Sequence, residues 1–410
     1  MLPKGWKRST LGDCTKLLSG NTPSKERQDY WSGEFPWVTV KDMKTPWLHR
    51  TGLTLTQAGK AAASVAPANS ILVVTRGMAL LKDLPISLAM REVAFNQDIK
   101  AIVPKDDLDA RFLAYQLQSK KHAVLDMVDT AGHGTGKLDT DLLKSVDLVL
   151  PPIPEQRRIA QILSTWDQAI ATAERLLANS QRCTRDLMAS MLSGRHRFPG
   201  FSDKWRFVDF DTVFERVTRK NSTQNTNVLT ISGEHGLISQ RDYFNKSVAS
   251  ANLSGYTLLH RYDFAYNKSY SAGYPMGAIK PLMAYDAGVV SSLYLCFRLR
   301  SDMDADFDFF RHYFEAGLLN QEIEGIAQEG ARNHGLLNVS VTDFFKLQLH
   351  IPTAPEQRRI AEVINVARAE EVRLQAQVQA LRKEKAALMS QLLTGKRRVK
   401  LPDTETEVQA

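Results

Sequence analysis

The sequence contains little of what a secreted, membrane-spanning or metal-binding protein needs. Its 410 residues include only three cysteines, Cys14, Cys183 and Cys296, which lie far apart and form no Cys-x-x-Cys pair. This usage argues against a disulfide framework or a zinc site and is typical of the reducing cytoplasm. No apolar run approaches about 18 residues, and the N-terminal segment MLPKGWKRST has no hydrophobic signal-peptide core. We therefore expect a cytoplasmic protein without a membrane span.

Motifs for catalysis are also missing. The one Pro-Pro pair, Pro151-Pro152, stands in LPPI and not in the Asn/Asp-Pro-Pro-Tyr/Phe context of amino-methyltransferases. The glycine-rich segment MVDTAGHGTGK is one residue short of a P-loop, has Leu138 in place of Ser/Thr, and precedes no long helix that could receive a phosphate. No His/Asp/Glu set has metal-ligand spacing, and no Ser/His/Asp set is placed for nucleophilic catalysis. We expect no catalytic residue, metal or cofactor on this chain.

The composition predicts an ordinary globular protein of two or three domains. Hydrophobic residues make up 43% of the chain and charged residues 24%, which is enough apolar material for real cores. The 53 basic and 45 acidic residues leave a net charge of +8. A basic excess of this size permits a nucleic-acid partner but does not require one.

A long internal repeat is the strongest signal in the sequence. The heptapeptide PEQRRIA occurs at 154–160 and again at 355–361, an offset of 201 residues. The same offset relates Gly194 to Gly395 and the Leu-Met pairs that precede them, so no insertion separates the two copies. A period this long indicates duplicated domains rather than a solenoid. The chain therefore consists of two halves, each a variable block followed by a nearly constant one.

Both constant blocks have the pattern of a long helix with one apolar seam. Pro154 and Pro355 suit a first helical turn, and Gly194 and Gly395 suit a left-handed stop after the last turn. About 40 residues correspond to roughly 60 Å of helix. The seam positions of the first helix are Ile159, Leu163, Trp166, Ile170, Ala173, Leu177, Ser180, Thr184, Leu187 and Met191. Those of the second are Ile360, Ile364, Ala367, Glu371, Leu374, Val378, Leu381, Lys385, Leu388 and Leu392.

An average step of 3.5 residues over more than four heptads predicts that the two helices pair as a coiled coil. The alternative is that each stripe packs on its own globular domain. Two similar halves are most simply related by a pseudo-two-fold axis, and the axis decides the direction of pairing. We expect antiparallel helices, because only that arrangement matches the two-folds of duplex DNA, which lie perpendicular to the helix axis.

The variable blocks are predicted to be mixed α/β domains. Strand-like runs such as FPWVTV and SILVVT precede the helical DARFLAYQLQSKK in the first block, and TNVLTIS and GVVSSLYLCFRL precede DFFRHYFEAGLLNQEI in the second. The predicted boundaries are a first domain at 1–153, a helix at 154–197, a second domain at 198–354, a second helix at 355–398 and a flexible tail at 399–410. The order of elements is similar in both blocks, whereas the residues differ.

Polar and aromatic residues gather in the predicted loops of both variable blocks. Arg and Lys pair with guanine edges, Asn and Gln pair with adenine, and any of them can contact phosphate. Each residue taken singly is more often simply a solvated loop residue. The candidates for contact with DNA are Thr22, Ser24, Lys41, Arg76, Asn96, Gln97, His133, Lys137, Asn267, Lys268, Tyr270, Tyr274, Lys280, Arg332, Asn333 and His334.

The complete layout resembles the specificity subunits of type I restriction-modification enzymes. The resemblance rests on both P-x-E-Q-R helices, on TPSKERQDYWSGEFPWVTVKDM and FNQDIKAI in the first block, and on YNKSYSAGYPMGAI in the second. It implies that each variable domain is a target-recognition domain reading one half of a bipartite, asymmetric site in double-stranded DNA. It also implies that the helices act as a spacer and bind two methyltransferase subunits, which are joined by restriction/translocase subunits. S-adenosylmethionine, ATP and Mg would then be used by these partners.

The helix starts and the seam supply candidates for helix pairing and partner docking. These are Gln156, Arg157, Arg158, Leu163, Trp166, Gln357, Arg358, Arg359, Ile364 and Leu374. A solvated first turn is the plain alternative for the polar members.

Two other functions remain open at the level of sequence. A fused DNA adenine methyltransferase with its own recognition domain would bind S-adenosylmethionine, which the missing catalytic motif argues against. A non-specific architectural coiled-coil protein would bind random and selected duplexes equally, and footprinting separates it from a sequence-specific reader.

Overall fold

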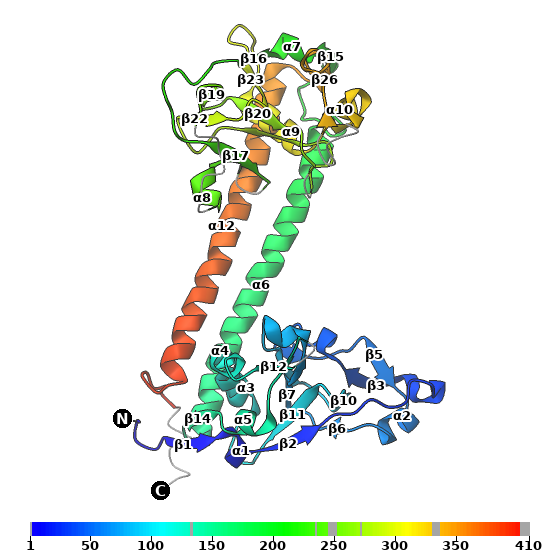
Figure 1. The fold of residues 1–410 in the computed structure, drawn as a ribbon, viewed down its shortest axis with the longest axis vertical. Helices are drawn as coiled ribbons and strands as arrows, with labels where there is room; N and C mark the ends of the chain where they lie inside the picture. Colours follow the sequence, from blue (N-terminus) through cyan, green and yellow to red (C-terminus); the bar gives the residue numbers. More distant parts are fainter. Residues whose placement is uncertain are drawn as a thin grey trace. The chain divides into compact units, whose positions relative to one another are not determined.

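Two long helices organise the chain in the computed structural model, which describes residues 2–131, 134–233, 236–244, 252–270, 273–329 and 337–401 (Figure 1). Helix α6 runs from Ile153 to Met191 and α12 from Ala354 to Leu392, each 39 residues long. The chain divides into a first unit, Met1–Ala173 with Gln377–Ala410, and a second unit, Glu174–Ala376. Each unit therefore contains one variable domain and one segment of each long helix. Residues 402–410 of the predicted tail lie outside the described residues.

The domain of the first unit is built on a five-stranded sheet with the order β2-β11-β7-β9-β4. Its strands pair antiparallel except for β4 and β9, which are parallel. The central strand β7 is buried along its whole length, as expected for its sequence ILVV. The strands are β2 (Thr15–Ser19), β4 (Trp47–Leu48), β7 (Ile71–Val74), β9 (Ile86–Ala89) and β11 (Ile99–Pro104). Helix α3 (Ala110–Ser119) covers this core with Phe112, Leu113 and Tyr115.

Smaller sheets complete the first domain. A four-stranded sheet has the order β5-β3-β10-β6, a three-stranded sheet the order β12-β13-β8, and β1 pairs with β14. The strands are β1 (Lys7–Thr10), β3 (Trp31–Val38), β5 (Leu53–Leu55), β6 (Val65–Ala66), β8 (Arg76–Gly77), β10 (Val93–Phe95), β12 (Asp129–Ala131), β13 (Thr135–Lys137) and β14 (Asp147–Leu150). The short helices are α1 (Leu11–Cys14), η1 (Gln28–Tyr30), η2 (Val40–Asp42), α2 (Gln57–Ala61), η3 (Met78–Leu81), α4 (Lys121–Leu125) and α5 (Thr140–Lys144).

The second domain repeats this order on a sheet arranged β16-β23-β20-β21, which corresponds to β2-β11-β7-β9. The strands are β15 (Arg206–Asp209), β16 (Phe214–Arg216), β17 (Leu229–Ser232), β18 (Gly236–Ser239), β19 (Thr257–His260), β20 (Phe264–Asn267), β21 (Ala278–Pro281), β22 (Ala287–Val290), β23 (Leu295–Leu299), β24 (Gln328–Glu329), β25 (Leu337–Asn338) and β26 (Gln348–Ile351). The helices are α7 (Phe210–Val213), α8 (Gln240–Phe244), α9 (Phe307–Glu315), α10 (Asn320–Ile326) and α11 (Val341–Phe344).

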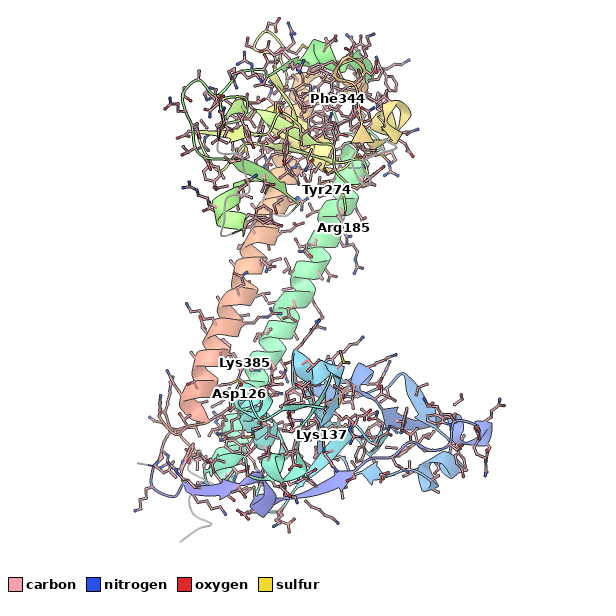
Figure 2. All side chains as sticks on the ribbon, viewed as in Figure 1. Asp126, Lys137, Arg185, Tyr274, Phe344 and Lys385 are labelled. Carbon is pink, nitrogen blue, oxygen red and sulfur yellow. The ribbon has the colours of Figure 1, made fainter. Side chains whose placement is uncertain are left out.

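Aromatic rings fill the second core more densely than the first. Phe210, Phe214, Phe264 and Phe297 have centroids within 6 Å of at least one other member of the set and are fully buried. Phe344 completes this core from α11 (Figure 2). The two halves thus share a mixed α/β scaffold whose cores are packed with different residues, as the sequence predicted.

Helices α6 and α12 pair antiparallel within each unit. In the first unit Glu155, near the start of α6, pairs with Arg398, which follows α12. Asp167, further along α6, pairs with Lys385, which precedes Arg398 in the chain and is labelled in Figure 2. In the second unit Glu356 pairs with Arg197, and a guanidinium nitrogen of Arg368 contacts Met188 Sδ at 3.4 Å. All twenty seam positions are buried or half-buried. The apolar stripes therefore face the inside of the helix pair.

Both helices end as the sequence predicted. Gly194 and Gly395 follow the last turns, and each has a φ of 73° in the left-handed region. A Cβ on Gly395 would lie 2.7 Å from Pro3, and one on Gly194 would lie 3.2 Å from Trp205. Glycine is therefore required both for the backbone conformation and for the close contact with the following or preceding domain segment. Among the described residues no helix is long and apolar enough to cross a membrane.

Candidate functional site

A buried ion pair connects the start of α6 with the segment that follows α12. Glu155 is 1% exposed and accepts two hydrogen bonds from Arg398, at 2.7 and 3.1 Å, and one from Trp6 Nε1 at 3.1 Å. A carboxylate held by three charged or aromatic donors is stable in a buried position, because its lost hydration is replaced. The first helix start is thus fixed to both ends of the described chain in this unit.

The second unit contains the equivalent pair. Arg197, which follows α6, donates two hydrogen bonds to the buried Glu356 at 2.7 and 2.9 Å. Arg197 and Arg398 are separated by the same 201 residues as the two glutamates. The candidate residues predicted from the sequence included neither the two glutamates nor the two arginines, although their common offset of 201 residues was a usable signal. The ion pairs explain why the repeat preserves a glutamate at the third position of each long helix.

The two glutamines of the repeat fix each domain to its helix. Gln156 is 1% exposed, accepts from the backbone N–H of Asp109 at 2.8 Å and donates to the carbonyls of Asp107 and Pro151. Gln357 is 2% exposed, accepts from the N–H of Asp306 at 2.9 Å and donates to the carbonyl of Pro352. Asp109 and Asp306 are the N-caps of α3 and α9, so each glutamine joins two helix starts. Neither glutamine is available to a partner surface.

The arginines of the repeat lie on the outside. Arg157 is exposed, and Arg158 donates to Gln161 at 2.9 Å. Arg358 pairs with Asp304 at 2.9 Å, and Arg359 pairs with Glu362 at 2.6 Å. The remaining docking and pairing candidates belong to the seam: Leu163, Ile364 and Leu374 are buried and Trp166 is half-buried.

Six of the DNA candidates in the first unit lie on neighbouring strands or on the segments that follow them. Strands β3 and β10 are parallel neighbours, so the segments after them, with Lys41 on one and Asn96-Gln97 on the other, emerge at the same edge. The Thr22 hydroxyl donates to Gln97 Oε1 at 2.6 Å. Asn96 is 9% exposed, and its Oδ1 has no hydrogen-bond partner within the described residues. A buried acceptor without a donor is unusual and is a candidate for a ligand or a water.

Two cations extend this surface. Arg76 and Lys137 are register partners of the antiparallel strands β8 and β13, and both are exposed. Lys137 is labelled in Figure 2. The backbone N–H of Arg76 donates to the carbonyl of Asp98, next to Gln97. Ser24 is exposed, and its carbonyl accepts from Trp31 Nε1 at 3.0 Å. Thr22, Lys41, Arg76, Asn96, Gln97 and Lys137 are hereafter called the first polar surface.

The second unit has a counterpart of this surface after β20. Asn267 ends the strand, Lys268 follows half-buried, and Tyr270 is 43% exposed. The N–H of Leu337 in β25 donates to the carbonyl of Lys268 at 2.9 Å, as the N–H of Leu138 after β13 donates to Thr75 at 2.9 Å. The same backbone arrangement therefore presents different side chains in the two domains.

Tyr274 and Lys280 lie inside the second domain and not on this surface. Lys280 is 7% exposed, forms an ion pair with Glu315 and donates to Tyr274 Oη at 2.7 Å. Tyr274 Oη donates to Glu315 at 2.9 Å. Burial raises the pKa of Tyr274. We leave both residues out of the DNA-contacting set, because the charge of Lys280 is neutralised internally. His133, Arg332, Asn333 and His334 lie outside the described residues.

The comparisons with known proteins find similarity to one family. Residues 3–179 match the family described as the type I restriction modification DNA specificity domain. The chain is 32% identical over 165 residues to the EcoR124I/EcoR124II specificity subunit of Escherichia coli, over 40% of both proteins. It is 29% identical over 178 residues to the MjaIX specificity subunit of Methanocaldococcus jannaschii, over 41% of this chain and 39% of that protein. This chain is therefore similar in sequence to type I restriction-modification specificity subunits over about two fifths of its length.

The fold of this chain is similar to solved structures over almost its whole length. The type I restriction-modification S subunit from M. genitalium has a TM-score of 0.58 and 14% identity, covering 95% of this chain and 96% of that one. The HsdS subunit from Thermoanaerobacter tengcongensis has a TM-score of 0.51 and 16% identity, covering 97% and 98%. The sequence matches to the two curated relatives are shorter and span only about two fifths of each relative.

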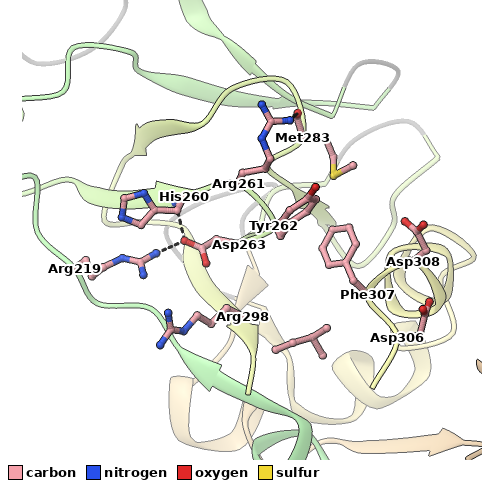
Figure 3. Close-up of a pocket in the computed structure, with 11 residues that line it drawn as sticks. Arg219, His260, Arg261, Tyr262, Asp263, Met283, Arg298, Asp306, Phe307 and Asp308 are labelled. Carbon is pink, nitrogen blue, oxygen red and sulfur yellow. Dashed lines mark hydrogen bonds and ion pairs between the residues drawn. The ribbon is translucent and has the colours of Figure 1, made fainter. Parts of the chain in front are cut away.

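The chain also contains a cavity of about 580 Å³ in its second unit, at the start of β20 (Figure 3). Asp263 accepts hydrogen bonds from Arg219 and from the N–H of His260, and Arg261 pairs with Asp286 at 2.8 Å. Tyr262 has a φ of 76° and its ring contacts Phe307 at 5.0 Å. The charges around this cavity are largely neutralised within the chain, and the cavity lies at the opposite end of β20 from Asn267. Among the described residues no group of three or more His, Cys, Asp or Glu could hold a metal ion.

Proposed function

We propose that this chain is a specificity subunit that binds double-stranded DNA in a sequence-specific manner, each domain reading one half of a bipartite, asymmetric site. The observation that supports this most directly is the repeated scaffold with unequal side chains. The two sheets have the same strand order, and equivalent backbone positions carry Thr75-Arg76 in one domain and Lys268-Ser269 in the other. A duplicated scaffold with different exposed polar groups suits two different base sequences.

The first polar surface has the chemistry that DNA recognition requires. Arg76, Lys137 and Lys41 supply exposed positive charge for phosphates or guanine edges, and Gln97 supplies an amide for a base edge. Thr22 holds the amide of Gln97 from the side, which reduces the entropy lost when that side chain contacts a base. In the second domain the corresponding contacts with phosphates and base edges come from Asn267, Lys268 and Tyr270.

The paired helices join the two readers and carry the partners of the complex. We propose that they set the spacer between the half-sites and dock two methyltransferase subunits, which are joined by restriction/translocase subunits. This chain has no catalytic role in the proposal; S-adenosylmethionine, ATP and Mg are used by the partners. The exposed Arg157 and Arg358 are the members of the repeat best placed for docking, since Gln156 and Gln357 are buried. The scarcity of cysteine supports a cytoplasmic site of action.

A domain exchange tests the recognition proposal. Residues 1–150 are replaced by the matching block of another specificity subunit, and the chimera is expressed with the methyltransferase partner in cells. Sequencing of the methylated DNA should show one half of the motif changed and the other half and the spacer preserved. A motif that changes in both halves contradicts independent reading, and an unselective pattern of binding favours an architectural protein.

Charge reversal tests the docking proposal. Arg157→Glu and Arg358→Glu should each weaken capture of the methyltransferase subunit in a pull-down, because both side chains are exposed on the helix starts. Arg175, on α6 but outside the repeated helix start, provides a matched reversal that should leave capture unchanged. Unchanged assembly of the double reversal contradicts docking at the helix starts.

A further inference from the structure

A groove opens beside the helix pair in the first unit. It has a volume of about 540 Å³ and is lined on its floor by Ile162, Trp166, Leu388 and Leu392. All four residues come from α6 or α12, at or next to the seam. The segment that follows α12, with Val399 and Lys400, forms one wall. The groove therefore belongs to the helix pair and the segment that follows it, and not to the variable domain.

Trp166 is the member of the floor that the fold itself uses least. Ile162 and Leu388 pack against the hydrophobic core of the first unit and Leu392 belongs to it, whereas half-buried Trp166 is not part of that cluster. Trp6 and Trp37 direct their indole N–H to hydrogen-bond acceptors, but in the described part of the chain Trp166 has no such partner. A large, half-buried tryptophan with a free N–H is the residue type that most often dominates the energy of an interface.

The repeat shows what the same position looks like when the chain fills it. The residue 201 positions after Trp166 is Ala367, and the residue 201 positions before Val399 is Phe198. Phe198 packs against the core of the second unit beside Leu187 and Val363, the equivalents of Leu388 and Ile162. The guanidinium of Arg359 lies 5.3 Å from the centre of the Phe198 ring and covers it. In the second unit the aromatic ring thus comes from the following segment and is covered, whereas in the first unit it belongs to the helix and faces the groove.

The rim of the groove is positively charged. Arg158, Arg397, Arg398 and Lys400 line it, and no carboxylate is among its lining residues. Arg398 is neutralised by Glu155, but Arg397 and Lys400 are exposed. An apolar floor with a cationic rim complements an apolar side chain flanked by carboxylates.

We propose that this groove docks one methyltransferase subunit through an apolar side chain with adjacent carboxylates, and that Trp166 is its anchor. The inference rests on the proposed function and adds an asymmetry to it. The covered position in the second unit offers no equivalent anchor, so the two methyltransferase subunits bind with unequal affinity. The tighter of the two binding steps belongs to the first unit.

The test is a titration of the full chain with the methyltransferase subunit, followed by calorimetry and native mass spectrometry. Wild type should show two binding steps of different affinity. Trp166→Ala should weaken the tighter step by about 30-fold, the effect of removing an interface anchor, and should leave the weaker step within about twofold. Ala367→Trp, the matched change in the second unit, should leave the tighter step unchanged. Equal affinities in the wild type, or an unaffected tighter step in Trp166→Ala, would overturn the proposal.

Further variants separate the remaining explanations. Arg397→Glu and Lys400→Glu alter only the exposed rim and should also weaken the tighter binding step. They therefore test the groove independently if Trp166→Ala disturbs the fold. A chain truncated after Leu401 should bind as the wild type; tighter binding would show that the chain's own acidic terminal segment occupies the groove. Concentration-dependent dimerisation lost in Trp166→Ala would instead assign the groove to a second copy. Absence of any methyltransferase binding by the wild type refutes the proposed function itself.

Discussion

The ion pair between Glu155 and Arg398 leads to an unequal pair of mutational effects. The carboxylate is 1% exposed, whereas the Arg398 side chain is 47% exposed. Arg398→Ala removes two of the three donors and leaves a buried charge with Trp6 as its partner. Glu155→Gln leaves an amide oxygen that still accepts hydrogen bonds, and the unpaired guanidinium of Arg398 is accessible to water. Arg398→Ala should therefore lower the stability of this part of the first unit more than Glu155→Gln does.

The magnitudes follow from burial. Breaking a buried ion pair by removing one partner costs about 3 to 5 kcal/mol when the remaining charge stays buried, and we take about 3 kcal/mol for Arg398→Ala because water reaches one side of the pair. Exchanging a charged acceptor for a neutral one in an otherwise satisfied site costs about 1 kcal/mol. The difference of about 2 kcal/mol corresponds to roughly a 30-fold difference in the local opening equilibrium.

Native-state hydrogen exchange measures this locally. Amides at the start of α6 and in β1 should lose protection in Arg398→Ala and much less in Glu155→Gln. Arg197→Ala provides the control, because it breaks the equivalent pair in the second unit and should leave first-unit protection unchanged. A larger loss in Glu155→Gln than in Arg398→Ala would show that the carboxylate is not the group whose burial governs this site.

Three further predictions concern pH, salt and spacing. Burial lowers the pKa of His312, which contacts Asn365; the unfolded chain therefore binds the proton first as pH falls below about 6.5. The second unit should therefore become less stable as the pH falls through this range. His312→Gln should flatten the pH dependence of its unfolding. Arg76→Ala and Lys137→Ala should each reduce the slope of log affinity for DNA against log salt by about 1, and unchanged slopes would remove them from the phosphate contacts. Four residues inserted at Ala178 add about 6 Å of helix and should lengthen the motif spacer by one or two base pairs with both half-sites intact; an unchanged spacer with full activity shows that the helices do not measure the gap.

The sequence predicted the long helices well because their signal is local. A step of 3.5 residues, a proline in the first turn and a glycine after the last are each readable within one segment. The helices occupy Ile153–Met191 and Ala354–Leu392, and every predicted seam position is at least half-buried. The direction of pairing, argued from symmetry, agrees with the ion pairs inside each unit.

The site residues were less accessible to sequence reasoning because their environments depend on distant segments. Lys280 follows a typical loop motif, yet it is buried because Glu315, 35 residues later in α9, lies against it. Gln156 lies in a polar first turn that the sequence alone would leave in solvent. Its side chain is instead hydrogen-bonded to the N–H of Asp109 and to two backbone carbonyls. In contrast, Arg76 and Lys137 are 61 residues apart in the sequence and become register partners only through strand pairing.

The identical heptapeptides also mark the boundary between each variable domain and the ion pairs of the long helices. Each unit takes the glutamate of one repeat and the arginine that follows the other, so the ion pairs depend on the constant blocks alone. A genetic crossover within 154–160 or 355–361 would replace a variable domain as a whole and leave Glu155, Glu356 and their arginines in place. Under the proposed function, one recombination step of this kind would create a new pair of half-sites, and selection would act on complete domains rather than on single loop residues.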